Sequence, residues 1–175
     1  MSTYCENSYV RIPQELAAEE LLKEIRSYLE QVCESERELA AKWHHSRIRH
    51  QKGDKWICLY GVAFKSLQEA NEIEVLRGLT QTYVDEVIMV SCFGVASFGA
   101  YGHFMEGALV RFTAASDDWT ESAGAPEPWE GELIVRMGGL HEGTIVELGR
   151  KLRLRDIANH ELVWDIDIPI RHESL

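Results

Sequence analysis

The chain has 175 residues, the length of one ordinary domain, and we predict a single globular domain over residues 1–175. Its 45% hydrophobic and 27% charged residues are typical of a folded protein and exclude a disordered chain. With 18 lysines and arginines against 29 aspartates and glutamates, the formal net charge is -11, which disfavours direct nucleic-acid binding and favours a basic protein partner. The same charge also keeps a protein soluble, so charge alone does not define a function.

The spacing of the cysteines predicts neither a zinc site nor a thioredoxin-type redox motif, because no two of them form a C-x-x-C pair. The four are Cys5, Cys33, Cys58 and Cys92. The residues after Met1 are polar, unlike an export signal, and no apolar run approaches the roughly 18 residues needed to span a membrane. We therefore expect reduced thiols, a cytoplasmic location and no membrane association.

Two main amphipathic helices are predicted from apolar residues that recur every three or four positions. The first covers residues 14–32, and its apolar stripe comprises Ala18, Leu22, Ile25, Leu29 and Val32. It either continues through residues 36–43 or is followed there by a separate short helix. The second main helix covers residues 67–80 and starts after a capping-box pattern.

A β-hairpin is predicted over residues 43–64, because Lys52-Gly53-Asp54 is a typical turn sequence. Its second strand, residues 56–64, has apolar side chains on both faces, which predicts a strand at the centre of a sheet. A buried strand over residues 83–93 follows the second helix, so that these elements form a strand–helix–strand unit. Another strand is predicted over residues 107–115.

Three further strands are predicted towards the C-terminus, over residues 131–137, 144–157 and 160–170. Turns at residues 138–139 and 158–159 separate them. The complete pattern predicts an α+β fold in which a single mixed, mostly antiparallel sheet carries the two main helices.

A glycine-rich and aromatic stretch, "FGVASFGAYGHF", covers residues 93–104. It lacks the lysine of a phosphate-binding loop and the spacing of a dinucleotide-binding loop. We interpret it as a connection between two strands, in which glycines allow a turn and phenylalanines close the end of the sheet. Exposed aromatic side chains in this stretch could instead contact a partner, so the role of residues 93–107 stays open.

The same stretch offers an alternative site for catalysis. His103 lies close in sequence to Tyr101 and Glu106, and a histidine within reach of a carboxylate could act as a general base. Ser97 is the nearest candidate nucleophile, but its surroundings do not match the G-x-S-x-G elbow of hydrolases. We treat a small enzyme with this site as the alternative hypothesis.

Neither a metal nor another cofactor is expected. His44 and His50 are six residues apart, roughly 20 Å along an extended strand, which is too far for one ion. Asp165 and Asp167 form a D-x-D pattern, but such short patterns occur often by chance, and alternation with apolar residues is normal for a strand with one wet face.

An exposed acidic loop is predicted over about residues 116–130, which combine carboxylates with two tryptophans and contain no lysine or arginine. The candidate partner-binding residues are Asp117, Asp118, Trp119, Glu121, Glu127, Trp129 and Glu130. Exposed tryptophans are favoured anchors at interfaces, although either could fold back onto the core. The sequence thus favours a small acidic interaction protein of the inhibitor, immunity-protein or adaptor type, with a basic partner such as a nuclease or another nucleic-acid-binding enzyme.

Overall fold

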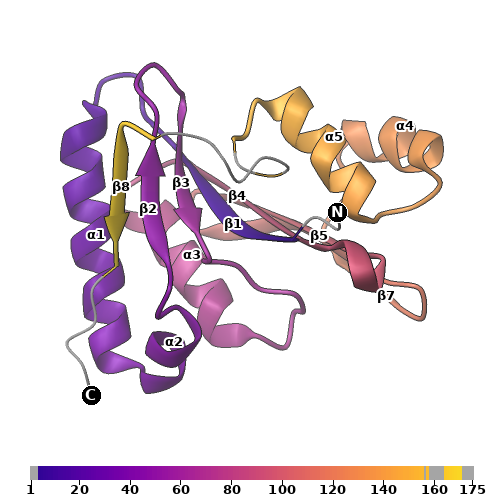
Figure 1. Ribbon diagram of the computed structural model, residues 1–175, viewed down its shortest axis with the longest axis horizontal. Helices are drawn as coiled ribbons and strands as arrows, with labels where there is room; N and C mark the ends of the chain where they lie inside the picture. Colours follow the sequence, from indigo (N-terminus) through magenta and orange to yellow (C-terminus); the bar gives the residue numbers. More distant parts are fainter. Residues whose placement is uncertain (1–3, 156, 158–163, 171–175) are drawn as a thin grey trace.

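A computed structural model describes residues 4–155, 157 and 164–170 of the chain. The described residues form an eight-stranded sheet and five α-helices, which confirms the α+β fold (Figure 1). The strands are β1 (Tyr4–Arg11), β2 (Arg47–His50), β3 (Trp56–Tyr60), β4 (Glu86–Phe93), β5 (Phe98–Met105), β6 (Ala108–Ala115), β7 (Thr120–Ala123) and β8 (Ile166–Pro169). The helices are α1 (Ala18–Ser35), α2 (Arg37–Lys42), α3 (Ala70–Thr82), α4 (Pro128–Met137) and α5 (Glu142–Leu152), with a short 3-10 turn at Gly94–Ala96.

The strand order is β7-β6-β5-β4-β1-β3-β2-β8, and every neighbouring pair is antiparallel. β1 lies between β3 and β4, so it separates the two strands of the expected strand–helix–strand unit. The sequence predicts that residues 56–64 form the central strand of the sheet. This prediction is wrong, because β4 and β1 take the centre, although β3 is an interior strand. β1 takes the central place even though Asn7 and Ser8, both fully buried, interrupt its apolar pattern.

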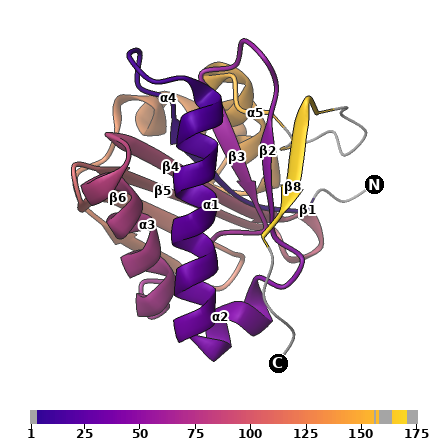
Figure 2. The same ribbon diagram turned by 90° about the vertical axis from the view of Figure 1, so that its left-hand side faces the viewer.

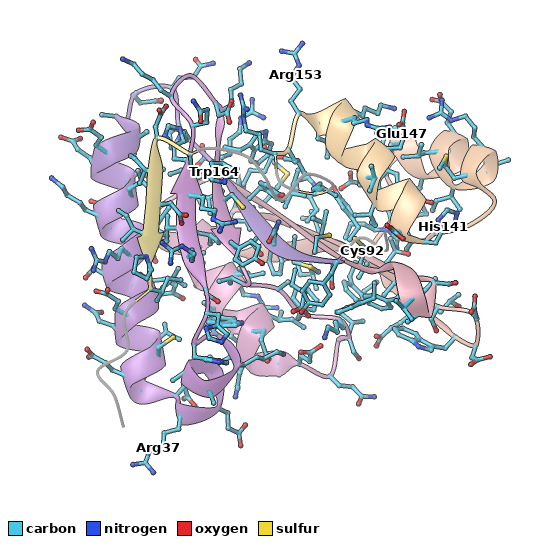
Figure 3. The ribbon with its side chains drawn as sticks, viewed as in Figure 1. Arg37, Cys92, His141, Glu147, Arg153 and Trp164 are labelled. Carbon is cyan, nitrogen blue, oxygen red and sulfur yellow. The ribbon has the colours of Figure 1, made fainter. Side chains whose placement is uncertain are left out.

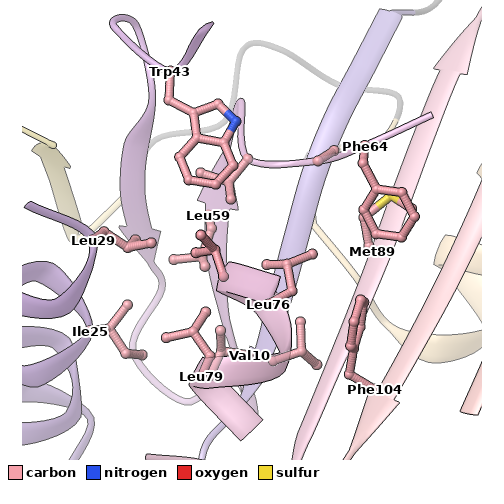
Figure 4. Packing of buried hydrophobic residues seen from close by; sticks show 14 of the residues in the cluster. Val10, Ile25, Leu29, Trp43, Leu59, Phe64, Leu76, Leu79, Met89 and Phe104 are labelled. Carbon is pink, nitrogen blue, oxygen red and sulfur yellow. The ribbon is translucent and has the colours of Figure 1, made fainter. Parts of the chain in front are cut away.

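Helices cover both faces of the sheet, and alternate residues along each strand enter two different cores. Seen from the side of α1, the helices α1, α2 and α3 lie in front of the sheet and α4 and α5 lie behind it (Figure 2). In the larger core, Leu76 and Leu79 of α3 and Ile25 of α1 pack towards Leu59 and Val10 of the sheet (Figure 4). Both faces are thereby closed, which explains the apolar residues on both faces of β3.

The glycine-rich stretch is only partly the expected connection: residues 94–97 join β4 to β5, whereas residues 98–105 form β5, which pairs with β4 along its whole length. A Cβ atom on Gly99 would lie 3.1 Å from backbone atoms of His141, so the glycine allows the start of α5 to approach the sheet. A second turn follows at Glu106 and Gly107, where the chain reverses into β6.

The strands expected over residues 131–137 and 144–157 are also wrong, because these segments form α4 and α5. Pro128 occupies the first turn of α4, where its missing N–H costs nothing. Glu127 and Glu130 form a reciprocal capping box, and Gly138 ends the helix at a φ of 78°. These start and stop signals decide for a helix although the segment "ELIVRM" also suits a strand.

The segment 116–130 is only partly a loop. It contains the edge strand β7 and the first turn of α4, and its last two residues are buried. At the C-terminus β8 falls within the strand expected over residues 160–170, whereas residues 160–163 and the expected turn at 158–159 lie outside the described residues. Among the helices that the structure describes, none combines the length and the apolar character needed to cross a membrane.

Candidate functional site

Charged side chains form a network on the sheet face that carries α4 and α5. Its centre is His103 on β5, whose Nδ1 contacts the carboxylate of Glu127 and whose Nε2 lies 3.0 Å from Oε1 of Glu86. Glu127 is the residue that caps α4, and Glu86 begins β4. The imidazole therefore joins two strands of the sheet to the start of a helix.

Tyr101 and Trp129 complete the surroundings of the Glu127 carboxylate. The Tyr101 hydroxyl and the Trp129 indole N–H donate to the same oxygen, Oε2, at 2.9 Å and 3.0 Å. The two rings also meet edge to face, with their centroids 5.0 Å apart. Glu127 thus accepts hydrogen bonds from three side chains, which fixes the orientation of α4 against the sheet.

The network continues on both sides of the histidine. On β6, Arg111 donates two hydrogen bonds of 2.6 Å to Glu130 of α4, and both side chains are almost completely buried. On β1, the Arg11 guanidinium lies 3.6 Å from Glu86. We call Arg11, Glu86, His103, Glu127, Arg111 and Glu130 the His103 network. Its cations lie on the strands β1, β5 and β6, and its carboxylates on β4 and at the start of α4, so that each buried charge has an opposite charge beside it.

The protonation of His103 follows from this position. Burial alone would lower its pKa, but the hydrogen bonds to Glu127 and Glu86 outweigh burial and raise the pKa to about 9. For Glu127, burial by itself would raise the pKa, but the bonds from His103 and Tyr101 hold it below its usual value. At neutral pH the pair is therefore an imidazolium and a carboxylate, with both ring nitrogens acting as donors.

This geometry does not support the alternative hypothesis of a general base at His103. A base needs an unprotonated nitrogen that faces a substrate, whereas both nitrogens of His103 face carboxylates. The structure brings Tyr101 and His103 to the same carboxylate, but not to Glu106, which occupies the exposed β5–β6 turn. The carboxylates that contact His103 are those of Glu86 and Glu127.

A cleft of about 750 Å³ lies between β6, β7 and the α4–α5 turn. Arg111 and Glu130 line it and are paired with each other. His141, which Figure 3 labels beside α5, also lines it. Its Nδ1 accepts from the backbone N–H of Gly143, and its Nε2 lies 2.9 Å from the carbonyl oxygen of Met137. These three groups hold the structure together and do not form an acid–base pair that faces the cleft.

A row of four aromatic rings crosses one end of the sheet. Tyr4 of β1 contacts Phe93 of β4, Phe93 contacts Phe98 of β5, and Phe98 contacts Trp119, with centroid separations of 4.7, 5.5 and 6.1 Å. We call these four residues the aromatic row. Tyr4 is 48% exposed and Trp119 is 41% exposed, so both ends of the row are accessible to a partner.

A groove of about 510 Å³ lies along the Trp119 end of the aromatic row. Asp117 and Asp118 line one part of it, and Lys65 lines another, with its ammonium group 4.4 Å from the centroid of the Phe93 ring. The residues from Ser116 to Trp119 form a tight turn closed by a backbone hydrogen bond of 2.9 Å. This β6–β7 turn lies between the groove and the larger cleft, because Ser116 and Asp117 line both.

The structure divides the candidate partner-binding residues into two groups. Asp117, Asp118 and Trp119 are exposed in the β6–β7 turn. The other four residues make contacts within the protein. Glu121 accepts from the backbone N–H of Leu67, Glu127 contacts His103, Glu130 pairs with Arg111, and Trp129 is buried.

The residues considered for a metal have other roles. Asp167 of β8 pairs with Arg47 and Arg49 of β2, and Asp165 accepts from the backbone N–H of Lys52. These contacts attach the last strand to the edge of the sheet. Within residues 4–155, 157 and 164–170 there is no group of three or more histidine, cysteine, aspartate or glutamate side chains that could hold a metal ion.

Sequence reasoning missed Arg11, Glu86 and Arg111 as members of the network. The sequence did contain one indication for Arg111. A single arginine in the apolar run "ALVRFTAA" indicates either a buried acidic partner or a position at the edge of the sheet. The identity of that partner depends on where α4 packs. In comparisons with known proteins, no family model, no curated protein sequence and no solved structure matches the chain.

Proposed function

We propose that the protein is an acidic interaction module that binds a basic segment of a partner protein with the β6–β7 turn and the aromatic row. The observation that carries the proposal is the exposed Trp119, which follows Asp117 and Asp118 and borders the 510 Å³ groove. Tryptophan is enriched among the residues that dominate binding energy at interfaces. Neighbouring carboxylates select a cationic partner.

A lysine side chain of the protein itself contacts the aromatic row and supports this choice of partner. The Lys65 ammonium lies over the Phe93 ring and 2.8 Å from a carboxylate oxygen of Glu6, so it combines a cation–π contact with an ion pair. An arginine of the partner placed over Trp119 would meet the same two chemistries, an aromatic face and the carboxylates of Asp117 and Asp118.

Long-range attraction supports the same class of partner. A net charge of -11 accelerates encounters with basic proteins and slows encounters with acidic ones. Nucleases and other nucleic-acid-binding enzymes carry cationic grooves that an acidic surface can occupy, which is how an inhibitor, immunity protein or adaptor of this kind would act. We include a cytoplasmic location in the proposal.

The experiment compares the wild type with two variants that lose the same charge. One is Asp117→Asn/Asp118→Asn in the β6–β7 turn, and the control is Glu24→Gln/Glu34→Gln on exposed positions of α1. Proteins captured from the native host are identified by mass spectrometry, and association is measured at several salt concentrations. The proposal predicts that the captured partner is basic. It also predicts that the association rate constant and its dependence on salt concentration decrease more in the turn variant than in the control.

Trp119→Ala tests the contribution of the aromatic row. Because the side chain is partly exposed, its removal should leave the fold intact while the partner dissociates faster, by about tenfold or more for a typical anchor residue. Equal binding by the wild type, the turn variant and Trp119→Ala would contradict the proposal, as would an acidic partner. The alternative of an enzyme with a general base at His103 is not proposed, because both ring nitrogens contact carboxylates.

A further inference from the structure

Two cysteines lie directly opposite each other in neighbouring strands at the middle of the sheet. Cys5 of β1 is the register partner of Cys92 of β4, and their sulfur atoms are 2.8 Å apart. Both side chains are almost completely buried. We propose that Cys5 and Cys92 form a reversible cross-strand disulfide when the protein meets a hydroperoxide.

The backbone geometry suits this bond without rearrangement of the strands. A disulfide requires Cα atoms about 4.4 to 6.8 Å apart. Residues that face each other in an antiparallel pair have Cα atoms about 4.5 or 5.5 Å apart, and both spacings lie within that range. The pair is located on the sheet face that carries α5, where Figure 3 shows Cys92. Closing the bond therefore requires mainly a small movement of the two sulfur atoms.

The other two cysteines do not share this arrangement. Cys58 of β3 lies opposite Tyr9 of β1 and Arg49 of β2, and Cys33 belongs to α1 on the other face of the sheet. The fold thus selects one specific pairing among the possible pairings of four cysteines. Cys58 and Cys33 provide internal controls for it.

The reaction needs a small oxidant, because the thiols are buried, and hydrogen peroxide is close to water in size. One sulfur attacks an oxygen of the peroxide, the O–O bond breaks, and a molecule of water leaves as the sulfur becomes a sulfenic acid. The second sulfur attacks this sulfenic sulfur, the S–O bond breaks, and a second molecule of water leaves. In total two thiols and one hydrogen peroxide give one disulfide and two waters, and two electrons pass from sulfur to oxygen.

The bond would stabilise the fold because it joins residues that are far apart in sequence. Linking Cys5 to Cys92, which are 87 residues apart in sequence, lowers the entropy of the unfolded chain. In the chain-entropy description, this stabilising effect increases with the length of the closed loop. For a chain of this size, we expect the melting temperature to rise by about 5 °C or more. A reductant such as dithiothreitol should reverse the change.

The test treats the full-length protein with a small excess of hydrogen peroxide, then denatures it and alkylates the remaining thiols. We expect two alkylated cysteines instead of four, and a cross-linked peptide that contains Cys5 and Cys92. Cys92→Ala should form no such cross-link and show no rise in melting temperature, whereas Cys58→Ala should behave like the wild type.

A second measurement removes the dependence on access to a buried site. The reduced protein is unfolded and refolded in a buffer of reduced and oxidised glutathione, in which the bond forms by thiol–disulfide exchange as the strands pair. The same cross-link should be recovered. Four alkylated thiols after both treatments, or a cross-link that involves Cys33 or Cys58, would overturn the proposal.

Discussion

Arg111 and Glu130 face each other between β6 and α4, and the guanidinium donates hydrogen bonds of 2.6 Å to both oxygens of the carboxylate. Arg111 also donates to the carbonyl oxygens of Ala123 and Gly124, at 3.1 and 3.0 Å. One buried side chain thereby holds together a sheet strand, the end of β7 and the first turn of a helix. Its loss would leave buried acceptors without their donor.

Arg111→Met should therefore destabilise the protein strongly. The variant leaves the Glu130 carboxylate buried without a counter-charge, which typically costs about 3 to 5 kcal/mol. The matched control is the double variant Arg111→Met/Glu130→Leu, which removes both charges and should recover most of that loss. Chemical denaturation measures the free energy of unfolding of all three proteins. A double variant as unstable as Arg111→Met would show that the carbonyl contacts of Arg111 and the capping box of Glu130, and not the ion pair, dominate.

His103 should make stability depend on pH. Its pKa in the folded state, about 9, lies above the ordinary value of 6.5, so its stabilising contribution is complete below about pH 6.5 and is lost as the pH rises through 9. The pKa of Glu127 is lowered, so its contribution is lost when the pH falls below the ordinary carboxyl value. The difference in unfolding free energy between wild type and His103→Gln should thus be largest between about pH 5 and 6.5.

The measurement for His103 is urea denaturation of both proteins at pH 6, 8 and 10. His45→Gln, at an exposed position, serves as the control for the loss of an imidazole and should match the wild type throughout. If the difference for His103→Gln were instead constant from pH 6 to pH 10, the imidazole would contribute through packing and not through its charge.

Leu59→Asp should prevent stable folding. Leu59 is fully buried on β3 between the sheet and the helices α1 and α3, and Figure 4 shows it surrounded by apolar side chains. An unpaired charge at such a position costs more than about 3 kcal/mol. Val135→Lys is the control, because Val135 is 79% exposed on α4 and should tolerate a charge. Circular dichroism during thermal unfolding distinguishes the two, and a cooperative transition of wild-type midpoint in Leu59→Asp would contradict the placement of β3.

Two glycines of α4 should respond in opposite directions to the same substitution. Gly131 lies within the helix, with nothing within 4 Å of an added Cβ atom, so Gly131→Ala should stabilise by about 0.5 to 1 kcal/mol. Gly138 ends the helix at a φ of 78°, so Gly138→Ala should destabilise by about 1 kcal/mol. Denaturant titration provides both values. A destabilising Gly131→Ala would favour the strand that the residue pattern predicts for this segment.

The sequence by itself determined the features that depend on local periodicity. The helical stripe of α1, the helix α3 and the buried strands β3 and β4 follow from spacings of three to four or of two residues, because these spacings state which side of an element is buried. The net charge follows from the composition, and the exposed acids Asp117 and Asp118 could be predicted because they lie in a segment without periodicity. The class of fold follows from the order of these elements.

Only the tertiary structure decided the features that depend on contacts between distant residues. β1 became the central strand because β3 and β4 both pair with it, although its own sequence is interrupted by polar residues. The segment "ELIVRM" is a different case, because the caps at Glu127 and Gly138 that favour its helix are local signals already present in the sequence. His103 meets Glu127 across 24 positions and Cys5 meets Cys92 across 87, and residue patterns carry no information about such pairs, because they record burial and not the identity of the neighbour.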